Sequence, residues 1–413
     1  MSFKLPAVIL SGGSEVVSLS IAEALIPHNI PLVLIYLGQH SLIKNIHPGM
    51  IYYELDWPPE SIESAIGRFL QIMDTIGAGQ PSPWPVFATE DEGLRLLMEG
   101  REQLSKYLAI PSSKRLKMGG LDKAEMFEFL SKNGMDKLIA PSIVLYDASQ
   151  ALMVLREFGR NAIFKPALRS ISYNIPLMKS KVITCKPNES DKSLVNRLSL
   201  AWSISDRWIG QPRLKMSNLG EAEWYGIRNS SGKIFGMTAT ERWIYPKLGG
   251  TACWVETCNI SELHRNAETI LKAIDSQGIF ELAFLEDDQG KFRLIEINSR
   301  PWLQISLTTH TGHPLIYATY LDLSRQELPD MPFKIMKKKW VNVERMFLAA
   351  LSGDYGARHL ALADALRTIY QSDCIAIYDT PFVKIRRRWV FRMMIKAIQK
   401  FLLSRSLNKN IGN

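Results

Sequence analysis

The segment "FRLIEINSRPW" (292–302) constrains the fold most, because it begins like a buried β-strand and then carries three polar side chains. Side chains alternate across a strand, so Phe292, Leu294, Glu296, Asn298 and Arg300 are predicted to share one face. A carboxylate, an amide and a guanidinium would then point to one place. The segment predicts a sheet strand whose end contributes to a chemical site.

The preceding strand, "GIFELAFLE" (278–286), leads into it through the turn "DDQG". A four-residue turn places Glu281 directly opposite Glu296. Two facing carboxylates repel each other, and a divalent cation between them reverses the sign of that interaction. Because Mg²⁺ prefers oxygen ligands, Glu281, Glu296 and Asn298 are candidate magnesium ligands, with Mn²⁺ as a substitute. The alternative at this point is an exposed sheet edge with solvated charges.

The hydrophobic pattern divides the 413 residues into several units. Strand, glycine turn, helix and strand follow one another at the N-terminus and again near 86–108, which predicts a parallel α/β domain. Five strands and a helix at 261–275 favour an antiparallel sheet with helices on one side. The predicted units are an α/β domain (1–110), a small α+β lobe (111–200), a strand-rich lobe (201–325), a C-terminal region (326–383) and a basic tail (384–413).

The basic tail accounts for the whole net charge of +9, because residues 380–413 contain nine Lys and Arg and no acid. The rest of the chain is neutral overall, so nucleic acid is not an expected partner. Basic residues recur every four positions from Arg388 to Lys400 among large apolar side chains. This pattern predicts peripheral contact of 385–409 with an anionic membrane, and a helix packed on the body is the alternative.

Other features point away from common classes of site. The four cysteines fit no metal-binding spacing and are expected to be reduced, and the turn "SGGS" lacks the spacing of a dinucleotide-binding loop. No apolar run approaches the roughly 20 residues of a membrane-spanning helix. A cytoplasmic location, with peripheral membrane contact as an addition, is the expectation.

Several segments together resemble the ATP-grasp superfamily. "LIEINSRPW" is similar to its E-x-N-x-R strand, "LDKAEMFEFLSKNGM" to its D-K helix, and "NAIFKPALR" to the strand with its second ATP lysine. The likeness extends to the carbamoyl-phosphate-synthase-like group of predicted carboxylate–amine ligases, through the helix at 312–323. It implies an α/β and α+β architecture, in which a pre-ATP-grasp parallel α/β domain precedes a two-lobed ATP-grasp fold.

The resemblance assigns roles to individual residues. Lys123 and Lys165 match the lysines that contact ATP phosphates, which suits the compact charge of an ammonium group. Glu296 and Asn298 match the metal ligands. Arg300 matches the arginine that steadies phosphate or an acyl phosphate. These five residues are therefore expected to surround the reacting phosphoryl group.

The same resemblance implies roles for further positions. Arg242 occupies a place where related enzymes have a basic residue toward the substrate, although a cross-strand pair with an acid is an equal alternative. Gln211 is expected near the adenine ring, and Glu221 or Glu223 near the ribose. Arg169 follows Lys165 in a segment that lacks the glycines many relatives use to cover the triphosphate, and could serve in their place.

The resemblance implies an ATP-dependent ligase that joins a small-molecule carboxylate to an amine through an acyl phosphate and releases ADP and phosphate. One departure is Ala283, which stands where the family has a further metal ligand; Glu281, two residues earlier, is the expected substitute. This departure leaves open a catalytically impaired ATP-binding protein. A membrane-surface or scaffold protein that acts through its tail is a third hypothesis.

Overall fold

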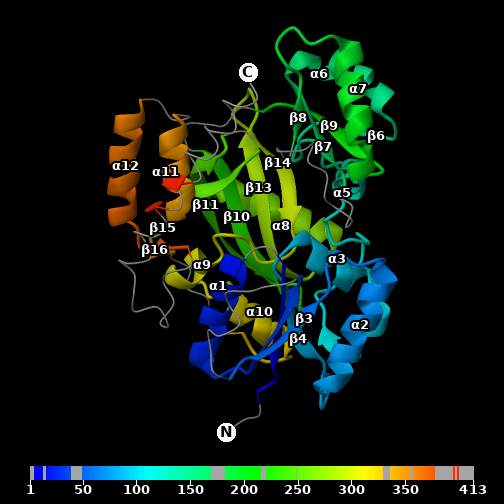
Figure 1. Ribbon diagram of the computed structural model, residues 1–413, viewed down its shortest axis with the longest axis vertical. Helices are drawn as coiled ribbons and strands as arrows, with labels where there is room; N and C mark the ends of the chain where they lie inside the picture. Colours follow the sequence, from blue (N-terminus) through cyan, green and yellow to red (C-terminus); the bar gives the residue numbers. More distant parts are fainter. Residues whose placement is uncertain are drawn as a thin grey trace.

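The computed structural model is built around one seven-stranded sheet, with the other parts of the chain on its faces and edges (Figure 1). The predictions for Arg169 and for most of the basic tail lie outside the residues that the structure describes. The described residues are 4–12, 15–38, 49–168, 182–214, 220–247, 249–328, 335–353, 357–376, 394–395 and 398–399.

The N-terminal part forms a parallel sheet in the order β3-β2-β1-β4-β5, covered by helices on both faces. Burial on both faces explains why β1 and β2 are almost entirely apolar, with Ser11 at the end of β1 as a buried polar residue. The elements are β1 (Ala7–Ser11), α1 (Glu15–Leu25), β2 (Leu32–Leu37), β3 (Ile51–Leu55), α2 (Ile62–Thr75), β4 (Trp84–Ala88), α3 (Asp91–Glu99), α4 (Arg101–Leu104) and β5 (Leu108–Ala109).

The small lobe contains an antiparallel four-stranded sheet in the order β6-β9-β7-β8. Its elements are β6 (Ile143–Leu145), α6 (Ala151–Phe158), β7 (Ala162–Pro166), β8 (Ile183–Thr184), α7 (Asp191–Ala201) and β9 (Trp208–Pro212). Because β9 pairs with β6 and β7, this lobe extends beyond the boundary at residue 200 that the sequence pattern indicated. Helix α5 (Lys123–Lys132) packs instead in the core beneath the central sheet.

The central sheet has the order β14-β13-β10-β11-β12-β15-β16 and includes the C-terminal region. All neighbouring strands are antiparallel except β15 and β16. The elements are β10 (Glu221–Arg228), β11 (Ile234–Tyr245), β12 (Thr251–Cys258), α8 (Ser261–Ile274), β13 (Gly278–Glu286), β14 (Phe292–Asn298), α9 (Ser306–His310), α10 (Leu315–Leu323), β15 (Lys339–Val341), α11 (Val343–Ser352), α12 (Arg358–Tyr370) and β16 (Cys374–Ile375).

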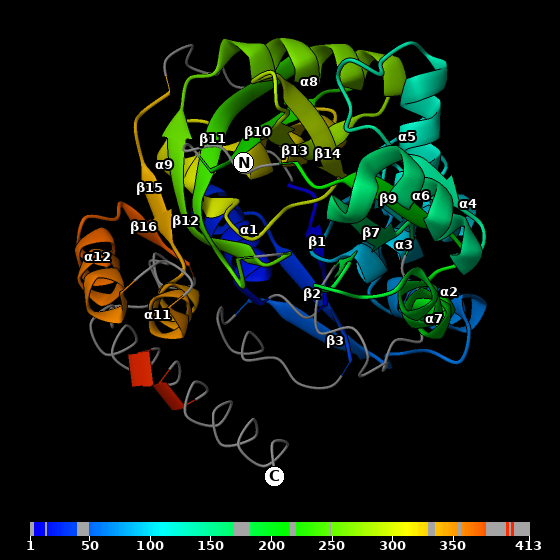
Figure 2. The same cartoon turned by 90° about the horizontal axis from the view of Figure 1, so that it is seen from above.

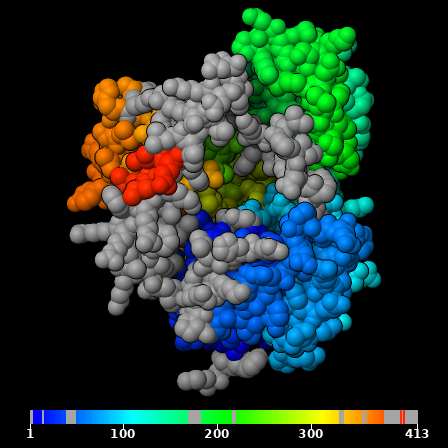
Figure 3. Space-filling view, in the orientation of Figure 1, coloured from blue at the N-terminus to red at the C-terminus, as the bar shows by residue number. Residues whose placement is uncertain are grey.

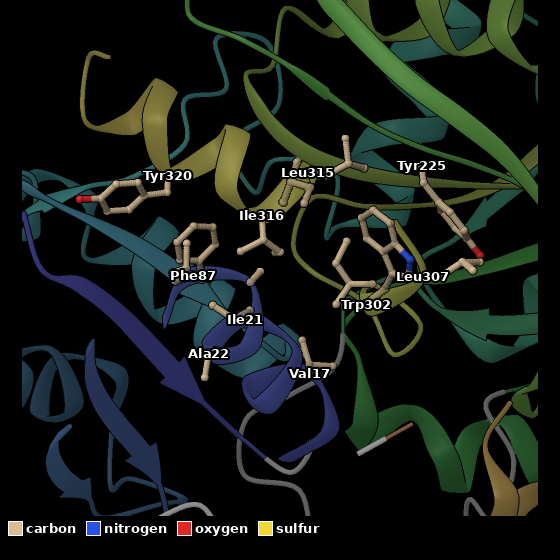
Figure 4. Packing of buried hydrophobic residues seen from close by; sticks show 14 of the residues in the cluster. Val17, Ile21, Ala22, Phe87, Tyr225, Trp302, Leu307, Leu315, Ile316 and Tyr320 are labelled. Atoms are coloured by element: carbon tan, nitrogen blue, oxygen red, sulfur yellow. The ribbon is translucent and has the colours of Figure 1, made fainter. Parts of the chain in front are cut away.

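The two faces of the central sheet have different coverings. Helices α8 and α5 bury one face, while α1, α9 and α10 cover part of the other. Figure 2 shows α8 and α1 on opposite sides of the strands. Figure 4 shows Ile316 of α10 beside Phe87 of β4, and Tyr225 of β10 beside Trp302. The rings of Tyr225 and Trp302 stack with centroids 4.7 Å apart. The N-terminal domain and the central sheet therefore share one hydrophobic core, which fixes their relative position.

The pairing of β13 with β14 differs from the predicted register. Glu281 lies opposite Asn298, and Ala283 lies opposite Glu296, so the expected Glu281–Glu296 pair is wrong. The loop has five residues, because Glu286 pairs with Phe292, and an irregularity between Ala283 and Phe284 adds a residue to β14. A bulge of this kind exchanges the faces of the side chains on its two sides.

Because of the bulge, the prediction that the five side chains from Phe292 to Arg300 share one face is wrong. Phe292 and Leu294 pack in the core with α8, whereas Glu296, Asn298 and Arg300 line the cavity on the opposite face. The polar residues therefore do converge, but without the two apolar residues before the bulge. Within the described residues, none of the helices is long and apolar enough to cross a bilayer.

Candidate active site

A cavity of about 1410 Å³ lies where the N-terminal domain, the small lobe, the central sheet and the C-terminal region meet. Figure 3 shows the hollow between the blue, green and orange parts of the surface. Helices α9 and α10 cover only part of one face of the central sheet, and the uncovered part of that face forms the floor of the cavity. The predicted residues Lys123, Lys165, Gln211, Glu221, Glu223, Glu281, Glu296, Asn298 and Arg300 all line this cavity.

The two predicted ATP lysines reach the cavity from different elements. Lys123 is the first residue of α5, whose N-cap Asp122 accepts a hydrogen bond from the Glu125 backbone N–H at 3.1 Å. The Lys123 ammonium lies 3.0 Å from Oε1 of Glu296. Lys165 lies on β7 of the small lobe and lines the facing wall. The lysines therefore approach the same space from the floor and from the roof.

An apolar slot opens between the small lobe and the outer strands of the central sheet. Ala140, Ala283 and Ile295 form a small buried cluster there, against which Leu214 and Leu285 pack. All five side chains line the cavity. A slot of this kind, with few polar groups, suits a flat aromatic ring.

Gln211, on β9, lines the cavity as well. Its side chain is 1% exposed, and its amide donates a hydrogen bond to Oγ of Ser142 at 2.8 Å. The side chain is thus held in place by the small lobe.

Glu281 is buried on the cavity floor and is held by two amides. Nδ2 of Asn298 donates to its Oε2 at 2.8 Å, and Nε2 of Gln304 lies 3.0 Å from its Oε1. Burial raises the pKa of Glu281 to about 8, aided by Glu296 and Glu221 and opposed by Asn298 and Arg300. Its hydrogen bond fixes the Asn298 amide, so that Oδ1 of Asn298 remains for another partner.

Ala283, which the resemblance marks as a departure from the metal-ligand pattern, lies directly opposite Glu296. Glu281 lies two residues before Ala283 on β13 and is paired with Asn298. In this structure its role is to hold Asn298 rather than to face Glu296. Gln304, which holds Glu281 from the other side, was not predicted, because it lies beyond the strand pattern in an irregular segment.

The acidic residues of β10 and β11 continue the floor next to Glu281. Glu221 lies opposite Glu241, and Glu223 lies between Ala239 and Ala283. Burial raises the pKa of Glu223 well above its usual value, and the charges of Glu281, Glu221 and Glu241 add to this shift. Glu241 was not among the predicted site residues, although its position opposite Glu221 follows from the β10–β11 hairpin.

Arg300 joins the end of β14 to the N-terminal domain. Its Nε donates a hydrogen bond to Oδ1 of Asp91 at 2.7 Å, and Asp91 begins helix α3. Although burial opposes the charged form of each group, Arg300 lowers the pKa of Asp91 and Asp91 raises that of Arg300. Arg300 is therefore a fixed positive charge at the cavity wall.

Arg242 is the predicted residue that the structure does not bring to the cavity wall. Its Nε lies 3.9 Å from Oε2 of Glu256 on β12, and its guanidinium lies 5.9 Å from the ring of Trp254. This matches the cross-strand alternative. Arg345 and Asn342, at the start of α11, line the cavity on that side, and the sequence pattern did not identify them.

Solved structures resemble this fold at low sequence identity. N5-Carboxyaminoimidazole synthetase from Staphylococcus aureus matches with a TM-score of 0.59 and 15% identity, over 85% of this chain and 86% of that chain. A biotin carboxylase–β-γ-ATP complex from Campylobacter jejuni matches with 0.61 and 16%, over 81% and 74%. L-amino acid ligase from Bacillus licheniformis matches with 0.55 and 12%, over 78% and 75%.

The chain has the ATP-grasp fold. The predicted fold class, a parallel α/β domain followed by a two-lobed ATP-grasp architecture, is thereby confirmed. By sequence, neither a family model nor a curated protein matches the chain. Since identities of 12–16% support only the fold, function has to be argued from the cavity itself.

Proposed function

We propose that this protein is an ATP-dependent ligase that joins a carboxylate to an amine and forms a C–N bond. The observation that carries the proposal is the convergence of Lys123, Lys165, Glu296, Asn298 and Arg300 on one cavity, next to an apolar slot. Two ammonium groups, a carboxylate–amide pair and a guanidinium match the needs of a bound triphosphate. A neighbour of the same fold was solved as a β-γ-ATP complex.

The nucleotide occupies the space between the small lobe and the floor in this proposal. The adenine ring fits the slot that contains Ala140, Ile295 and Leu285, and Gln211 lines the same cavity. The phosphates then extend toward Lys123 and Lys165, whose charges offset the negative charge of the triphosphate.

Glu296 and the Asn298 amide oxygen are the groups that would hold Mg²⁺, with Mn²⁺ as a substitute. The donor set fits a hard cation, because it consists of oxygens and the 2.8 Å hydrogen bond to Glu281 orients the amide. Phosphate oxygens and water complete such a shell, which is how Mg²⁺ is usually bound at nucleotide sites. The bound cation would neutralise charge on the phosphates.

The reaction has two displacement steps. A carboxylate oxygen of the substrate forms a bond to the γ-phosphorus while the bond between that phosphorus and ADP breaks, which gives an acyl phosphate. The amine nitrogen then bonds to the carbonyl carbon, phosphate leaves, and the amine loses a proton. The protein contributes position and positive charge rather than a covalent intermediate. Arg300, held by Asp91, provides a fixed charge beside the reacting groups.

A second candidate function is ATP binding without ligation, and the observation that favours it is Ala283 opposite Glu296. With no carboxylate at that position, the cation has one ligand fewer. Under this candidate the protein binds the nucleotide but releases no ADP with any carboxylate and amine.

ADP release in the presence of hydroxylamine distinguishes the two candidates. Hydroxylamine captures an acyl phosphate as a hydroxamate, so a screen over amino acids and sugar acids needs no knowledge of the natural amine. The wild type is expected to release ADP and form hydroxamate with at least one acid, and Lys165→Ala and Glu296→Ala are expected to lose both. Lys272→Ala, on the exposed side of α8 where Lys272 pairs with Glu268 at 2.6 Å, is the matched control. Activity that survives in both cavity variants would remove the ligase proposal.

A further inference from the structure

Three carboxylates lie together on the cavity floor, apart from Glu296 and Asn298. Glu221, Glu223 and Glu241 each offer an oxygen, and these oxygens lie within 4.8 Å of one another. In the part of the chain that the structure describes, this is the group of acids that meets this criterion. Glu223 is 2% exposed and Glu241 is 8% exposed, so water offers these charges little screening.

The strand geometry fixes this cluster. Glu221 and Glu241 are directly paired across β10 and β11, and Glu223 follows Glu221 on the same face. Gly220, just before Glu221, has φ +94°, and a Cβ added there would lie 2.1 Å from the carbonyl oxygen of Glu241. Only glycine therefore allows β10 to begin this close to β11. The close approach of the three acids is built into the backbone.

A second observation concerns one oxygen of this cluster, on Glu223. Oε2 of Glu223 is buried and has no hydrogen-bond donor among the described residues. The amide of Gln304, which also lines the cavity, lies within hydrogen-bond distance of Tyr225, Glu241 and Glu281. A buried carboxylate oxygen without a donor is costly, and two further carboxylates beside it add repulsion. A bound cation removes both penalties.

We propose that Glu221, Glu223 and Glu241 form a divalent metal site, separate from the nucleotide-associated cation at Glu296 and Asn298. Carboxylate oxygens favour hard cations such as Mg²⁺, Mn²⁺ and Ca²⁺. With metal–oxygen distances of about 2.0–2.6 Å, ligand oxygens of one shell lie about 3–5 Å apart, which agrees with the spacing here. This assignment differs from the ribose contact that the family resemblance implied for Glu221 or Glu223.

A chain of hydrogen bonds links this site to the nucleotide site. The Gln304 amide lies 2.9 Å from Oε1 of Glu241 and 3.0 Å from Oε1 of Glu281, and Glu281 accepts from Asn298 at 2.8 Å. A cation on Glu241 would therefore help to hold Gln304, Glu281 and Asn298 in place. The proposed site has a positioning role for the ligand set that faces the nucleotide.

Binding of Mn²⁺ alone, without nucleotide, tests this inference. The concentration of free Mn²⁺ is followed by electron paramagnetic resonance as the full-length protein is titrated. The wild type is expected to bind Mn²⁺, and the double variant Glu223→Gln/Glu241→Gln is expected to bind one ion fewer per chain. Glu296→Gln should retain this ion. Glu256→Gln is the matched control, because Glu256 lies on the neighbouring strand β12 and pairs with Lys339 at 3.2 Å.

Equal Mn²⁺ binding by the wild type and the double variant would overturn the proposal, as would loss of the ion in Glu296→Gln alone. Thermal unfolding provides a second measurement and a test of folding. In EDTA the double variant should be at least as stable as the wild type, because it removes buried charge, and Mn²⁺ should raise the Tm of the wild type only. A wild-type Tm that does not respond to Mn²⁺ would also contradict the site. Because no nucleotide is present, these results do not depend on ligase activity.

Discussion

The substitution Glu281→Gln makes the pH dependence of stability a test of the cavity floor. In the folded protein the pKa of Glu281 is about 8, because of burial first and the charges of Glu296 and Glu221 second, against an ordinary value of 4.5. Between these two pH values the folded state holds a proton that the unfolded state has lost. Stability from this group is therefore fully present below about pH 4.5 and is lost as the pH rises through about 8.

The size of the effect follows from the shift. Each pKa unit corresponds to about 1.4 kcal/mol, so ionising Glu281 by pH 8 costs the wild type about 4 kcal/mol of unfolding free energy. Glutamine has no charge to bury, but it loses one acceptor for Asn298 or Gln304, which costs about 1 kcal/mol. The variant should therefore match the wild type within about 1 kcal/mol at pH 5 and exceed it by about 3 kcal/mol at pH 8.

Urea unfolding in EDTA at the two pH values, followed by tryptophan fluorescence, measures this difference. Glu256→Gln controls for the removal of a carboxylate that is paired with Lys339 at 3.2 Å. A difference between Glu281→Gln and the wild type that is the same at pH 5 and pH 8 would refute the argument that Glu281 is buried and protonated near neutral pH.

Three further predictions concern the ion pair, the missing ligand and the tail. Arg300→Ala should lower kcat for ADP release about 100-fold with little change in ATP affinity. Asp91→Asn should lower the free energy of unfolding by only about 1 kcal/mol, because the Asp91 side chain is 42% exposed. Comparable losses of ATP affinity in both variants would contradict this prediction. Ala283→Glu places a carboxylate opposite Glu296 and should lower the Mg²⁺ concentration for half-maximal activity about tenfold, so an unchanged Mg²⁺ dependence would count against the metal ligands. Deletion of 385–413 should abolish co-sedimentation with anionic liposomes, and equal pelleting of both forms would exclude membrane contact by the tail.

The general architecture was predictable because its signals are local. Apolar strands that alternate with amphipathic helices identified the parallel α/β domain, and the polar end of β14 identified the cavity floor. The register of the β13–β14 hairpin was not predictable in the same way. Ile295 is as apolar as Leu294, so nothing in the sequence indicates a bulge at this point. The five-residue loop and the residue added at the bulge each shift the pairing by one position, and together they move the partner of Glu281 from Glu296 to Asn298.

The remaining site residues depend on contacts between distant segments. Asp91 and Arg300 are 209 positions apart and meet only because the N-terminal domain and the central sheet share one core. Gln304 follows β14 in an irregular segment, where no period predicts the direction of its side chain. Glu241 could have been found by pairing β10 with β11, since Glu221 lies opposite, but that pairing requires the loop between the strands to be known.

The fate of the substrate carboxyl oxygen tests the central claim most directly. A carboxylate that supports ADP release is labelled with ¹⁸O in its carboxyl group, and the released phosphate is examined by mass spectrometry. Transfer of a carboxyl oxygen to phosphorus, which an acyl phosphate requires, predicts one ¹⁸O in each phosphate released with the amide product. Unlabelled phosphate, with ADP release intact, would contradict the proposal that this cavity activates a carboxylate with ATP.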